Sequence, residues 1–422
     1  MSITSIQKDP NLNNQDRCGR TVLMNEFRFG SNEEVLLEIL KQKPDLNIQD
    51  RYGKTPVMYA FEQCSNKEVL LEILKQKPNL DIQDQSGQTS LMYAVSLCSI
   101  KEVLLEILKQ KPDLNIQNKE CQTVLMLAIQ YCTIEDVLLE IIKQKPDLNI
   151  QDKIGNTVLM YAVRYCTIEK VILEILKQKP DLNIKNQLNR TVIIYALIYF
   201  NNEKKILLEI LKQKPDLNIR DQEYQTAIMY AFRTMFYDEI KIEIILEIIL
   251  EMLKQKPDLN IQDQCGNTAL IYALRKCTNK KTNNELNIRY KESQNIIMDS
   301  YIKDIKKEII LEIIKKTSYL NIQDKRSKKT ALMYGLEFIS DKEILLEIIK
   351  KTSNLNVQDL YGKTAIMYGF EFCTIDEVLL EILKKTPNLN IQDQDSKTAI
   401  MYGFKYYKNE KEVLLELLKQ KP

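Results

Sequence analysis

Two kinds of apolar segment alternate along the chain and recur throughout it. A run of the type Thr-Val-Leu-Met-Tyr-Ala is followed, a few residues later, by a run of the type Glu-Val-Leu-Leu-Glu-Ile-Leu. Apolar residues in the second run fall three and four positions apart, which predicts an amphipathic helix. A polar segment of the type Pro-Asp-Leu-Asn-Ile-Gln-Asp then separates each pair of runs from the next. The pattern predicts helix–turn–helix units joined by extended segments.

A threonine opens each unit and gives the period of the chain. The intervals between these threonines are 34 residues five times, then 35, 42 and 62, then 34 twice. A fixed period between about 20 and 50 residues indicates a stack of one repeated supersecondary unit. We number the units as repeats 1 to 11 after their threonines, which are Thr21, Thr55, Thr89, Thr123, Thr157, Thr191, Thr226, Thr268, Thr330, Thr364 and Thr398.

Helix ends can be predicted from capping residues. Each threonine suits the N-cap of the first helix, which we expect to reach about nine residues beyond it. For the second helix, Ser/Thr-x-x-Glu spacing predicts capping boxes, and a proline after Lys-Gln-Lys predicts its end. The glycine two residues before the threonine predicts a turn with positive φ. The predicted boxes are Ser31/Glu34, Ser65/Glu68, Ser99/Glu102, Ser340/Glu343 and Thr374/Glu377.

The wording of the unit resembles a known family. Gly-x-Thr-x-Leu-x-x-Ala, a Val-x-x-Leu-Leu helix and Asp-Leu-Asn-x-x-Asp together resemble the ankyrin repeat. The tetratricopeptide repeat has the same length, but it has no room for the extended segment. The resemblance implies an all-α (mainly helical) repeat solenoid, with stacked helix–turn–helix units joined by β-hairpin-like fingers. Residues 1–422 would form a single solenoid of about 11 repeats, with first helices and finger tips on its concave side.

Two departures from the family stand out. The family's Thr-Pro-Leu-His box reads Thr-x-x-Met here, as at Met24 and Met58. We interpret this change as apolar packing in place of histidine's hydrogen bonds, which predicts a less rigid finger. The family's alanine in the first helix becomes Gly335, Gly369 and Gly403 in the last three repeats. Glycine in a helix costs about 1 kcal/mol relative to alanine, so the C-terminal third is predicted to be the least stable.

Repeats 7 and 8 are longer than the others. Eight extra residues in repeat 7 are expected to lengthen its second helix, 238–256, by two turns. Repeat 8 carries an insertion at 278–307, within which 293–316 reads as one long helix. The insertion is either a tolerated loop, or a partner-specific lever or hinge, and the sequence leaves both interpretations open.

Composition argues against catalysis. The chain has no histidine, so the usual general base at neutral pH and the commonest zinc ligand are absent. We therefore expect no enzyme activity and no cofactor or metal. Six of the nine cysteines share one column, one per repeat, which we interpret as small buried residues. Apolar stretches are too short to span a membrane, and reduced thiols suit a cytoplasmic protein. An Ile-, Lys- and Asn-rich composition suggests an AT-rich genome, such as that of a giant virus, a protist or an intracellular bacterium. If the chain is viral or an effector, host cytoplasm or nucleus is expected.

The predicted function is a non-enzymatic protein–protein interaction scaffold. Finger-tip residues vary most between repeats, as a recognition surface requires, whereas Lys-Gln-Lys on the second helix is nearly invariant and suits a solvated convex face. Two aromatic columns lie four and eight residues after the threonine. They serve either packing between repeats or partner recognition, because tyrosine is enriched in interfaces. The candidate partner-binding residues are Arg51, Tyr52, Gln85, Ser86, Lys119, Glu120, Lys153, Ile154, Gln187, Leu188, Tyr93, Tyr131, Tyr161, Tyr165, Tyr195 and Tyr199.

Two further surfaces are open to other partners. The finger of repeat 9 carries a basic cluster, Lys325, Arg326, Lys328 and Lys329, which with Arg275, Lys276, Lys280 and Lys281 suggests an acidic or nucleic-acid partner. A net charge of only +2 makes nucleic acid the weaker alternative. The last repeat has no polar outer face, so its apolar end is predicted to fray or to associate with another chain. The protein partner itself cannot be identified from the sequence.

Overall fold

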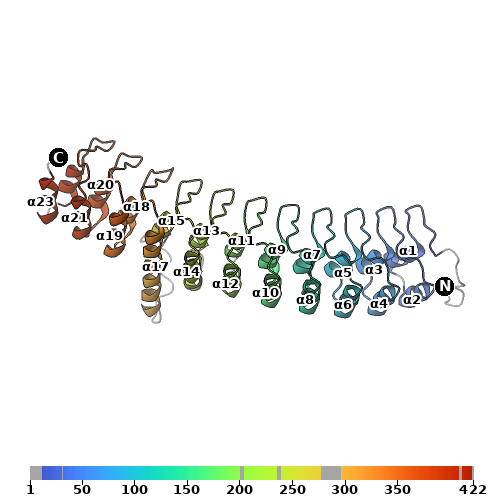
Figure 1. The fold of residues 1–422 in the computed structure, drawn as a ribbon. Coiled ribbons are helices and arrows are strands. Elements are labelled where there is room, and N and C mark those ends of the chain that lie inside the picture. The colour runs from blue at the N-terminus through green and yellow to red at the C-terminus, as the bar shows by residue number, and fades with distance from the viewer. Residues whose placement is uncertain are drawn as a thin grey trace. The chain divides into compact units, whose positions relative to one another are not determined.

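The computed structural model describes residues 12–30, 32–199, 204–234, 239–276, 296–407 and 411–420. Within these ranges the regular structure is helical, apart from two isolated antiparallel bridges between Gln151 and Thr157 and between Gln392 and Thr398. The chain divides into two compact units, Met1–Tyr199 (unit 1) and Phe200–Pro422 (unit 2). Figure 1 shows in each unit short paired helices with a finger projecting from every pair. The predicted helical repeat fold is confirmed.

Unit 1 is a two-layer stack. Each first helix packs on the first helix of the next repeat, and each second helix packs on the next second helix. The first helices begin one residue after the threonine and are eight residues long or one shorter, close to the predicted length. The helices are α1 Val22–Phe29, α2 Glu33–Lys41, α3 Pro56–Gln63, α4 Lys67–Lys75, α5 Ser90–Leu97, α6 Lys101–Lys109, α7 Val124–Tyr131, α8 Glu135–Lys143, α9 Val158–Tyr165, α10 Glu169–Lys177 and α11 Val192–Ile198.

Unit 2 repeats this arrangement with two longer second helices. In repeat 7 the second helix has 16 residues, and in repeat 8 it has 21, so both predicted extensions are confirmed in the described residues. Residues 238 and 277–295, which include most of the predicted insertion, lie outside those residues. The helices are α12 Lys204–Lys212, α13 Ala227–Thr234, α14 Glu239–Lys254, α15 Ala269–Lys276, α17 Ile296–Lys316, α18 Ala331–Phe338, α19 Lys342–Lys351, α20 Ala365–Phe372, α21 Asp376–Lys384, α22 Ala399–Tyr406 and α23 Lys411–Lys419.

Apolar residues of both layers form the core between repeats. In α6 the residues Val103, Leu104, Ile107 and Leu108 are fully buried, with the three- and four-residue spacing that the sequence shows. Acidic residues occupy the first turns of most second helices and lysines occupy the last turns, which suits the helix dipole. The second helix therefore buries one face and leaves the other to charged side chains.

Backbone hydrogen bonds join neighbouring fingers. The amide of Gln85 donates to the carbonyl of Tyr52 at 2.8 Å, and the amide of Lys119 donates to that of Ser86 at 2.9 Å. The turn at each tip needs a positive φ, which Gly53 and Gly87 supply as predicted. Repeats without this glycine put another residue into the same conformation. These residues are Cys121, Asn189, Tyr224, Lys328 and Ser396.

Two predictions about local hydrogen bonds are wrong. The second helices begin one residue later than the predicted capping boxes, so that Asn66 and Asp341 are the N-caps and accept from Val69 and Ile344. Ser31 lies outside the described residues, and Asn32 caps α2. The second error concerns the column of methionines. In four repeats the methionine sulfur accepts a hydrogen bond from the threonine amide, at 3.4 Å for Met24 and for Met58.

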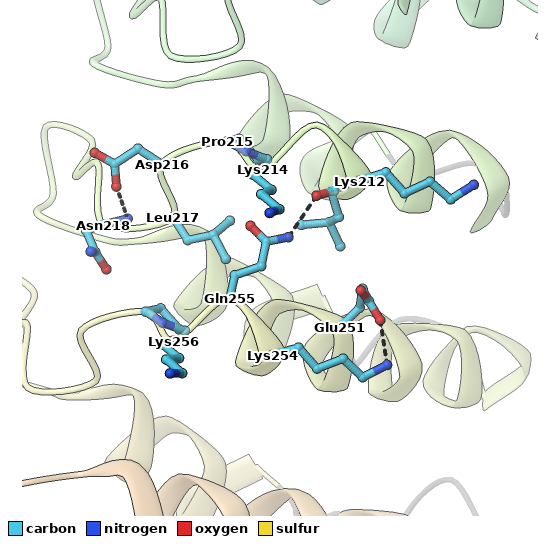
Figure 2. A pocket seen from close by; sticks show the side chains of 12 residues that line it. Lys212, Lys214, Pro215, Asp216, Leu217, Asn218, Glu251, Lys254, Gln255 and Lys256 are labelled. Atoms are coloured by element: carbon cyan, nitrogen blue, oxygen red, sulfur yellow. Dashed lines mark hydrogen bonds and ion pairs between the residues drawn. The ribbon is translucent and has the colours of Figure 1, made fainter.

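The recurring Lys-Gln-Lys segment, which repeats 8 to 10 replace with Lys-Lys-Thr, is also more than a solvated surface. Its glutamine donates to a carbonyl at the end of the preceding repeat's second helix: Gln110 Nε2 lies 2.8 Å from the oxygen of Leu74. Figure 2 shows the equivalent bond from Gln255 to Leu211, beside an open groove lined by Lys214, Pro215 and Leu217. The glutamine thus joins successive layers by adding a second hydrogen bond to a carbonyl at the helix end; the Leu74 carbonyl also accepts from the amide of Lys77 at 3.0 Å.

Glycines in the last three first helices permit close packing. A Cβ added at Gly369 would lie 2.6 Å from Leu379 Cδ2, and one at Gly403 would lie 2.7 Å from Leu417 Cδ2. The two helices of these repeats therefore approach more closely than an alanine methyl would allow. The predicted lower stability of the C-terminal third stays a prediction, since the closer packing opposes the conformational cost of glycine.

Candidate functional site

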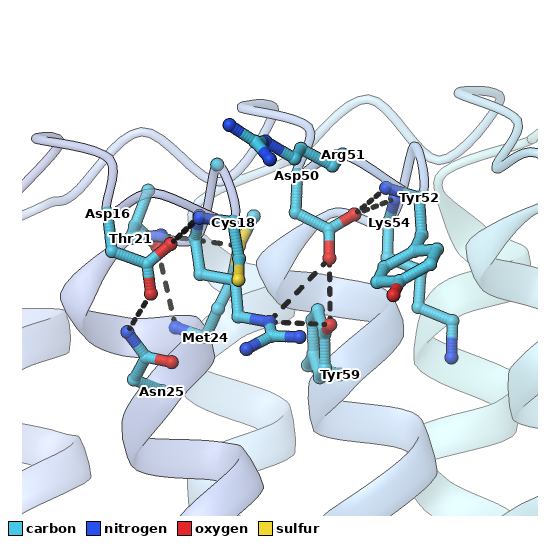
Figure 3. A network of polar contacts seen from close by, with 12 residues as sticks. Asp16, Cys18, Thr21, Met24, Asn25, Asp50, Arg51, Tyr52, Lys54 and Tyr59 are labelled. Atoms are coloured by element: carbon cyan, nitrogen blue, oxygen red, sulfur yellow. Dashed lines mark hydrogen bonds and ion pairs between the residues drawn. The ribbon is translucent and has the colours of Figure 1, made fainter.

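In nine of the eleven repeats a tyrosine stands four residues after the threonine and holds the finger against the first helix. Tyr93 donates its hydroxyl proton to Asp84 Oδ2 at 2.8 Å, and Tyr161 donates to Asp152 Oδ2 at 2.9 Å. The other carboxylate oxygen of Asp84 accepts from the backbone amides of Ser86 and Gln88 in the finger turn. Figure 3 shows the same arrangement around Asp50 and Tyr59. One buried carboxylate thus links the finger turn to the helix.

The tyrosine four residues after the threonine has a structural role, so three of the candidate partner-binding residues are interpreted differently. Tyr161 and Tyr195 are buried, and Tyr93 is half-buried. Burial, followed by the bond to Asp84, raises the pKa of Tyr93 far above its ordinary value. Gln122 donates to the hydroxyl of Tyr161, and Asn186 donates to that of Tyr195. These hydroxyl groups are occupied inside the protein, so they are not available to a partner.

The second aromatic column faces outward in repeats 3 to 6. The exposed fraction is 57% for Leu97, 54% for Tyr131 and 40% for Tyr165, and Tyr199 is half-buried. The Arg164 guanidinium lies 4.9 Å from the ring centres of both Tyr165 and Tyr199. A strip of one leucine and three tyrosine rings, with one cation between two of the rings, therefore follows the first helices of four consecutive repeats.

The predicted finger-tip residues lie at the surface as a continuous row. All ten are exposed, including the apolar side chains of Tyr52, Ile154 and Leu188. Lys153 pairs with Glu120 of the preceding finger at 3.3 Å, with both side chains more than half exposed. Such a pair contributes little to stability, so most of this row is free to vary without unfolding the stack.

Three repeats close the first-helix face with an ion pair that the sequence reasoning missed. In repeats 2, 9 and 10, the lysine before the threonine lies 2.7 Å from a glutamate eight residues later, and its ammonium also lies over tyrosine rings of two successive repeats. We call these groups Lys–Glu clamps. The sequence signal for this ion pair was a lysine one residue before the threonine together with a glutamate seven residues after it. The clamps are Lys54/Glu62, Lys329/Glu337 and Lys363/Glu371.

The clamps reduce the predicted basic cluster. Lys329 is ion-paired with Glu337 and lies 4.9 Å from the ring centre of Tyr368, so it is not a free cation. Lys325, Arg326 and Lys328 are exposed on the finger of repeat 9. Arg275 stacks on the ring of Tyr334 at 5.7 Å. Lys280 and Lys281 lie outside the described residues, as does the side chain of Lys276, and three exposed cations remain on the finger.

The cysteine column stabilises the turn between the two helices. Cys132 and Cys373 are buried, and burial raises the pKa of both thiols. In repeat 3, Cys98 Sγ accepts from the amide of Ile100, whereas the thiols of Cys64 and Cys373 donate to turn carbonyls. Cys277 lies outside the described residues. Across those residues, no three His, Cys, Asp or Glu side chains gather as a metal ion requires.

The outer face of the last repeat exposes residues that inner repeats bury. Met401 is 55% exposed, against 0% for its counterpart Met367, and Phe404 is 45% exposed, against 1% for Phe370. Leu415 and Leu418 of α23 are exposed beside them. Association through this face stays a prediction. Among the described helices, none combines the length and the apolar character that crossing a bilayer demands.

Comparison with known protein families agrees with the repeat structure described above. Residues 27–118, 63–152, 91–186 and 125–221 match the family described as ankyrin repeats (3 copies). No similar protein was found among curated sequences. One solved structure with a similar fold is titled as the predatory endopeptidase Bd0816 from Bdellovibrio bacteriovorus in complex with immunity protein Bd3460. The similarity has 26% identity and a TM-score of 0.38, and covers 47% of this chain and 100% of that one.

A second similar structure is the ankyrin repeat domain of Bcl-3, described as a member of the IkappaB protein family. It has 19% identity and a TM-score of 0.41, with 52% of this chain and 94% of that one covered. Beyond the matched residues, repeats 8 to 11 keep the threonine, the tyrosine–aspartate bond and the bonds between fingers. Residues 27–221 therefore belong to the ankyrin-repeat family, and the later repeats keep the same contacts.

Proposed function

We propose that this protein is a non-enzymatic interaction scaffold that binds a partner protein on the face formed by its first helices and finger tips. The contact is centred on repeats 3 to 6 of unit 1. The observation that carries the proposal is the strip of Leu97, Tyr131, Tyr165 and Tyr199, which places a leucine and three tyrosine rings at the surface of four consecutive first helices. Ankyrin repeats generally mediate protein–protein interaction, and this strip supplies a surface for it.

Burial and chemistry separate the contact residues from the structural ones. The finger tips add the exposed side chains of Ile154 and Leu188 beside the strip, and exposed aromatic and arginine side chains are typical anchors of interfaces. Tyr93, Tyr161 and Tyr195 leave the set of proposed contacts, because their hydroxyl groups hold the fingers. The column of reduced thiols supports a location in the cytoplasm or another reducing compartment.

An acidic or nucleic-acid partner is the second candidate. The exposed cations Lys325, Arg326 and Lys328 on the finger of repeat 9 favour it. Such binding would depend steeply on salt, because each phosphate contact releases counterions. The measurement is binding of a fluorescent single-stranded oligonucleotide at two salt concentrations, with Lys325→Ala/Lys328→Ala as the variant. Binding that neither salt nor the double variant changes would exclude this candidate.

Site-specific photocrosslinking tests the main proposal. A photoreactive amino acid replaces Tyr131 or Leu188 on the proposed face, or Lys109 on the charged face of α6, where it pairs only with Glu106 at 2.7 Å and stays exposed. We expect the same partner to be crosslinked from positions 131 and 188 and not from 109. Crosslinking from 109 alone would place the partner on the second helices and refute the proposal.

A further inference from the structure

Repeats 3 to 5 carry a row of paired apolar side chains where the first helix ends and the second begins. We call it the rim patch. The first member of each pair is the last residue of the first helix and is exposed, and the second lies three residues later and is half-buried. The rim patch consists of Leu97 and Ile100, Tyr131 and Ile134, and Tyr165 and Ile168.

The isoleucines stand where a helix N-cap is expected. Ile100, Ile134 and Ile168 immediately precede α6, α8 and α10 in extended conformation. Asn66 occupies this position in repeat 2 and accepts a bond from Val69 N at 3.0 Å. An Asn or Asp N-cap stabilises a helix by about 1 kcal/mol relative to an apolar residue. Three successive repeats give up this stability for side chains that are only half-buried, which points to a contact outside the stack.

The spacing of the rim patch fits a helix. Packed helices lie about 8–10 Å apart, so the patch offers two apolar side chains at each interval of that length. An α-helix with apolar a and d positions presents two side chains every seven residues, which is about 10.5 Å. One face of a β-strand presents a side chain every ~6.6 Å. A polyproline helix presents one per turn of ~9.3 Å. Only the α-helix presents its side chains in pairs, and its interval of about 10.5 Å is close to the separation of packed helices.

The charges beside the rim patch select an acidic partner. Seven residues after the threonine, repeats 3 to 6 have Ser96, Gln130, Arg164 and Ile198, where repeats 2, 9 and 10 have glutamate. Among the described residues, no carboxylate forms an ion pair with Arg164. The acidic first turns of the second helices are partly neutralised by cross-repeat ion pairs, such as Lys170 with Glu135 at 2.7 Å. The acidic first turns belong to the second helices, so the charge on the first-helix side of the rim patch is that of Arg164 and is positive.

We infer that the rim patch binds an amphipathic α-helix of about two heptads, with acidic residues along the flank that meets Arg164. The inference rests on the proposed function and adds the chemistry of the partner to it. Leucine- or isoleucine-type side chains of the helix pack between the pairs Leu97/Ile100, Tyr131/Ile134 and Tyr165/Ile168. Glutamate or aspartate on its flank pairs with the Arg164 guanidinium, which the rings of Tyr165 and Tyr199 hold in place.

Four synthetic peptides test the inference against the full chain. All have about 18 residues and the same number of leucines: a heptad peptide with a glutamate flank, its lysine-flank twin, a scrambled glutamate peptide, and a proline-rich peptide. Fluorescence anisotropy measures each Kd. We expect the glutamate heptad peptide to bind at least tenfold more tightly than each of the other three. Equal affinities for the glutamate and lysine twins, or tighter binding of the proline-rich peptide, would overturn the inference.

Two variants with a matched control separate contact from folding. Ile134→Asn supplies an N-cap and is expected to raise the thermal midpoint while weakening peptide binding at least fivefold. Ile375→Asn makes the same change before α21 in unit 2 and should raise the midpoint without affecting binding. Arg164→Gln should abolish the preference for the glutamate flank. Unchanged binding by Ile134→Asn would contradict the inference.

The inference and the proposed function fail separately. If no peptide binds, while crosslinking from positions 131 and 188 still captures one protein, the surface is correct and its occupant is not an acidic helix. If crosslinking also fails at both positions, the proposed function falls as well. If the glutamate peptide binds and Ile134→Asn weakens it, both stand.

Discussion

Repeats 3 to 6 and repeats 9 and 10 use the same helix face in opposite ways. In repeats 9 and 10, Lys–Glu clamps lie over the tyrosine rings, and each charge has a partner within the face. In repeats 3 to 6 the corresponding pairs are Gln88/Ser96, Gln122/Gln130, Asn156/Arg164 and Arg190/Ile198. One pair of columns thus decides whether a lysine and a glutamate form an ion pair over the tyrosine rings. It does not decide the exposure of the second aromatic column, since Phe372 of repeat 10 is 44% exposed. The two regions share one fold, so a difference in recognition between them would come from the residues that flank the threonine.

A second difference lies at the joints between layers. Gln110 donates one bond to the carbonyl of Leu74, whereas the Lys385 ammonium donates to the carbonyls of Ile349, Lys350 and Thr352. An ammonium at a helix C-terminus is also favoured by the helix dipole. The change from Lys-Gln-Lys to Lys-Lys-Thr late in the chain therefore replaces a neutral hydrogen bond between layers with hydrogen bonds from a charged ammonium group.

The largest effect on stability should come from the carboxylate that joins finger and helix. Asp152→Ala leaves the Tyr161 hydroxyl and the amides of Ile154 and Asn156 without their acceptor, and we expect a loss of about 2–4 kcal/mol in the free energy of unfolding. Tyr165→Ala, one turn further along the exposed face, should cost less than about 1 kcal/mol. Urea denaturation followed by circular dichroism measures both. Equal losses would contradict the division into structural and exposed aromatics.

Breaking a Lys–Glu clamp should have a smaller effect on the free energy of unfolding. Lys363 and Glu371 are about four-fifths buried, so a double-mutant cycle with Lys363→Met and Glu371→Gln should give a coupling of about 1 kcal/mol at low salt. The exposed pair Lys143 and Glu140 is the control and should couple by less than about 0.5 kcal/mol. If the two couplings are the same, the clamp does not close the face of repeats 9 and 10.

Introducing a Lys–Glu clamp into repeat 5 of unit 1 should make its first-helix face resemble that of repeats 9 and 10. Asn156→Lys with Arg164→Glu places the clamp residues on either side of Thr157, and the lysine then lies near the ring of Tyr161. We expect capture of the partner to fall at least tenfold and the free energy of unfolding to fall by about 1–2 kcal/mol, because Asn156 is buried and its Oδ1 accepts from Asn186 Nδ2 at 3.0 Å. Asn156→Lys alone is the control. Undiminished capture by the double variant would show that the open face of repeat 5 is not needed.

The tyrosine–aspartate bonds should have no pH dependence near neutrality and a clear one in alkali. Burial, and next the aspartate bond, raises the pKa of Tyr93 and Tyr368 in the folded state. Their contribution is therefore complete below pH 10, the ordinary tyrosine value, and is lost as the pH rises above it. We expect the urea midpoint to fall above pH 10, with a smaller fall in Tyr93→Phe. Tyrosinate absorbance from these rings that appears before helicity is lost would oppose this account.

The sequence predicts the repeat, the first helices and the turn glycines because each depends on neighbours within a few residues. Thr89, for example, caps α5 by a local bond to Met92 N. Errors arise where two local signals compete or where partners lie in other repeats. Ser65 and Asn66 are both good caps, and the structure selects Asn66. The bond from Gln110 to Leu74 spans 36 residues, which no local pattern indicates.

The candidate site was predictable in part for the same reason. The finger tips follow from variation between repeats, and all ten predicted tip residues are exposed. The helix period cannot separate Tyr161 from Tyr165, because residues four apart share a helix face. Only the distance from Tyr161 to Asp152, nine residues earlier in the finger, shows that the first tyrosine is structural. The clamp columns were visible in the sequence as matched lysine and glutamate but are adjacent only in the fold.

Quantitative capture of the partner by two matched double variants tests the central claim most directly. Tyr131→Ala/Tyr165→Ala removes the exposed rings of repeats 4 and 5, and Phe372→Ala/Tyr406→Ala removes the corresponding exposed rings of repeats 10 and 11. Both pairs should leave the urea midpoint nearly unchanged. We predict that the first variant loses at least nine-tenths of the captured partner and that the second retains it. Loss of capture by the second variant alone would place recognition in unit 2 and contradict the account.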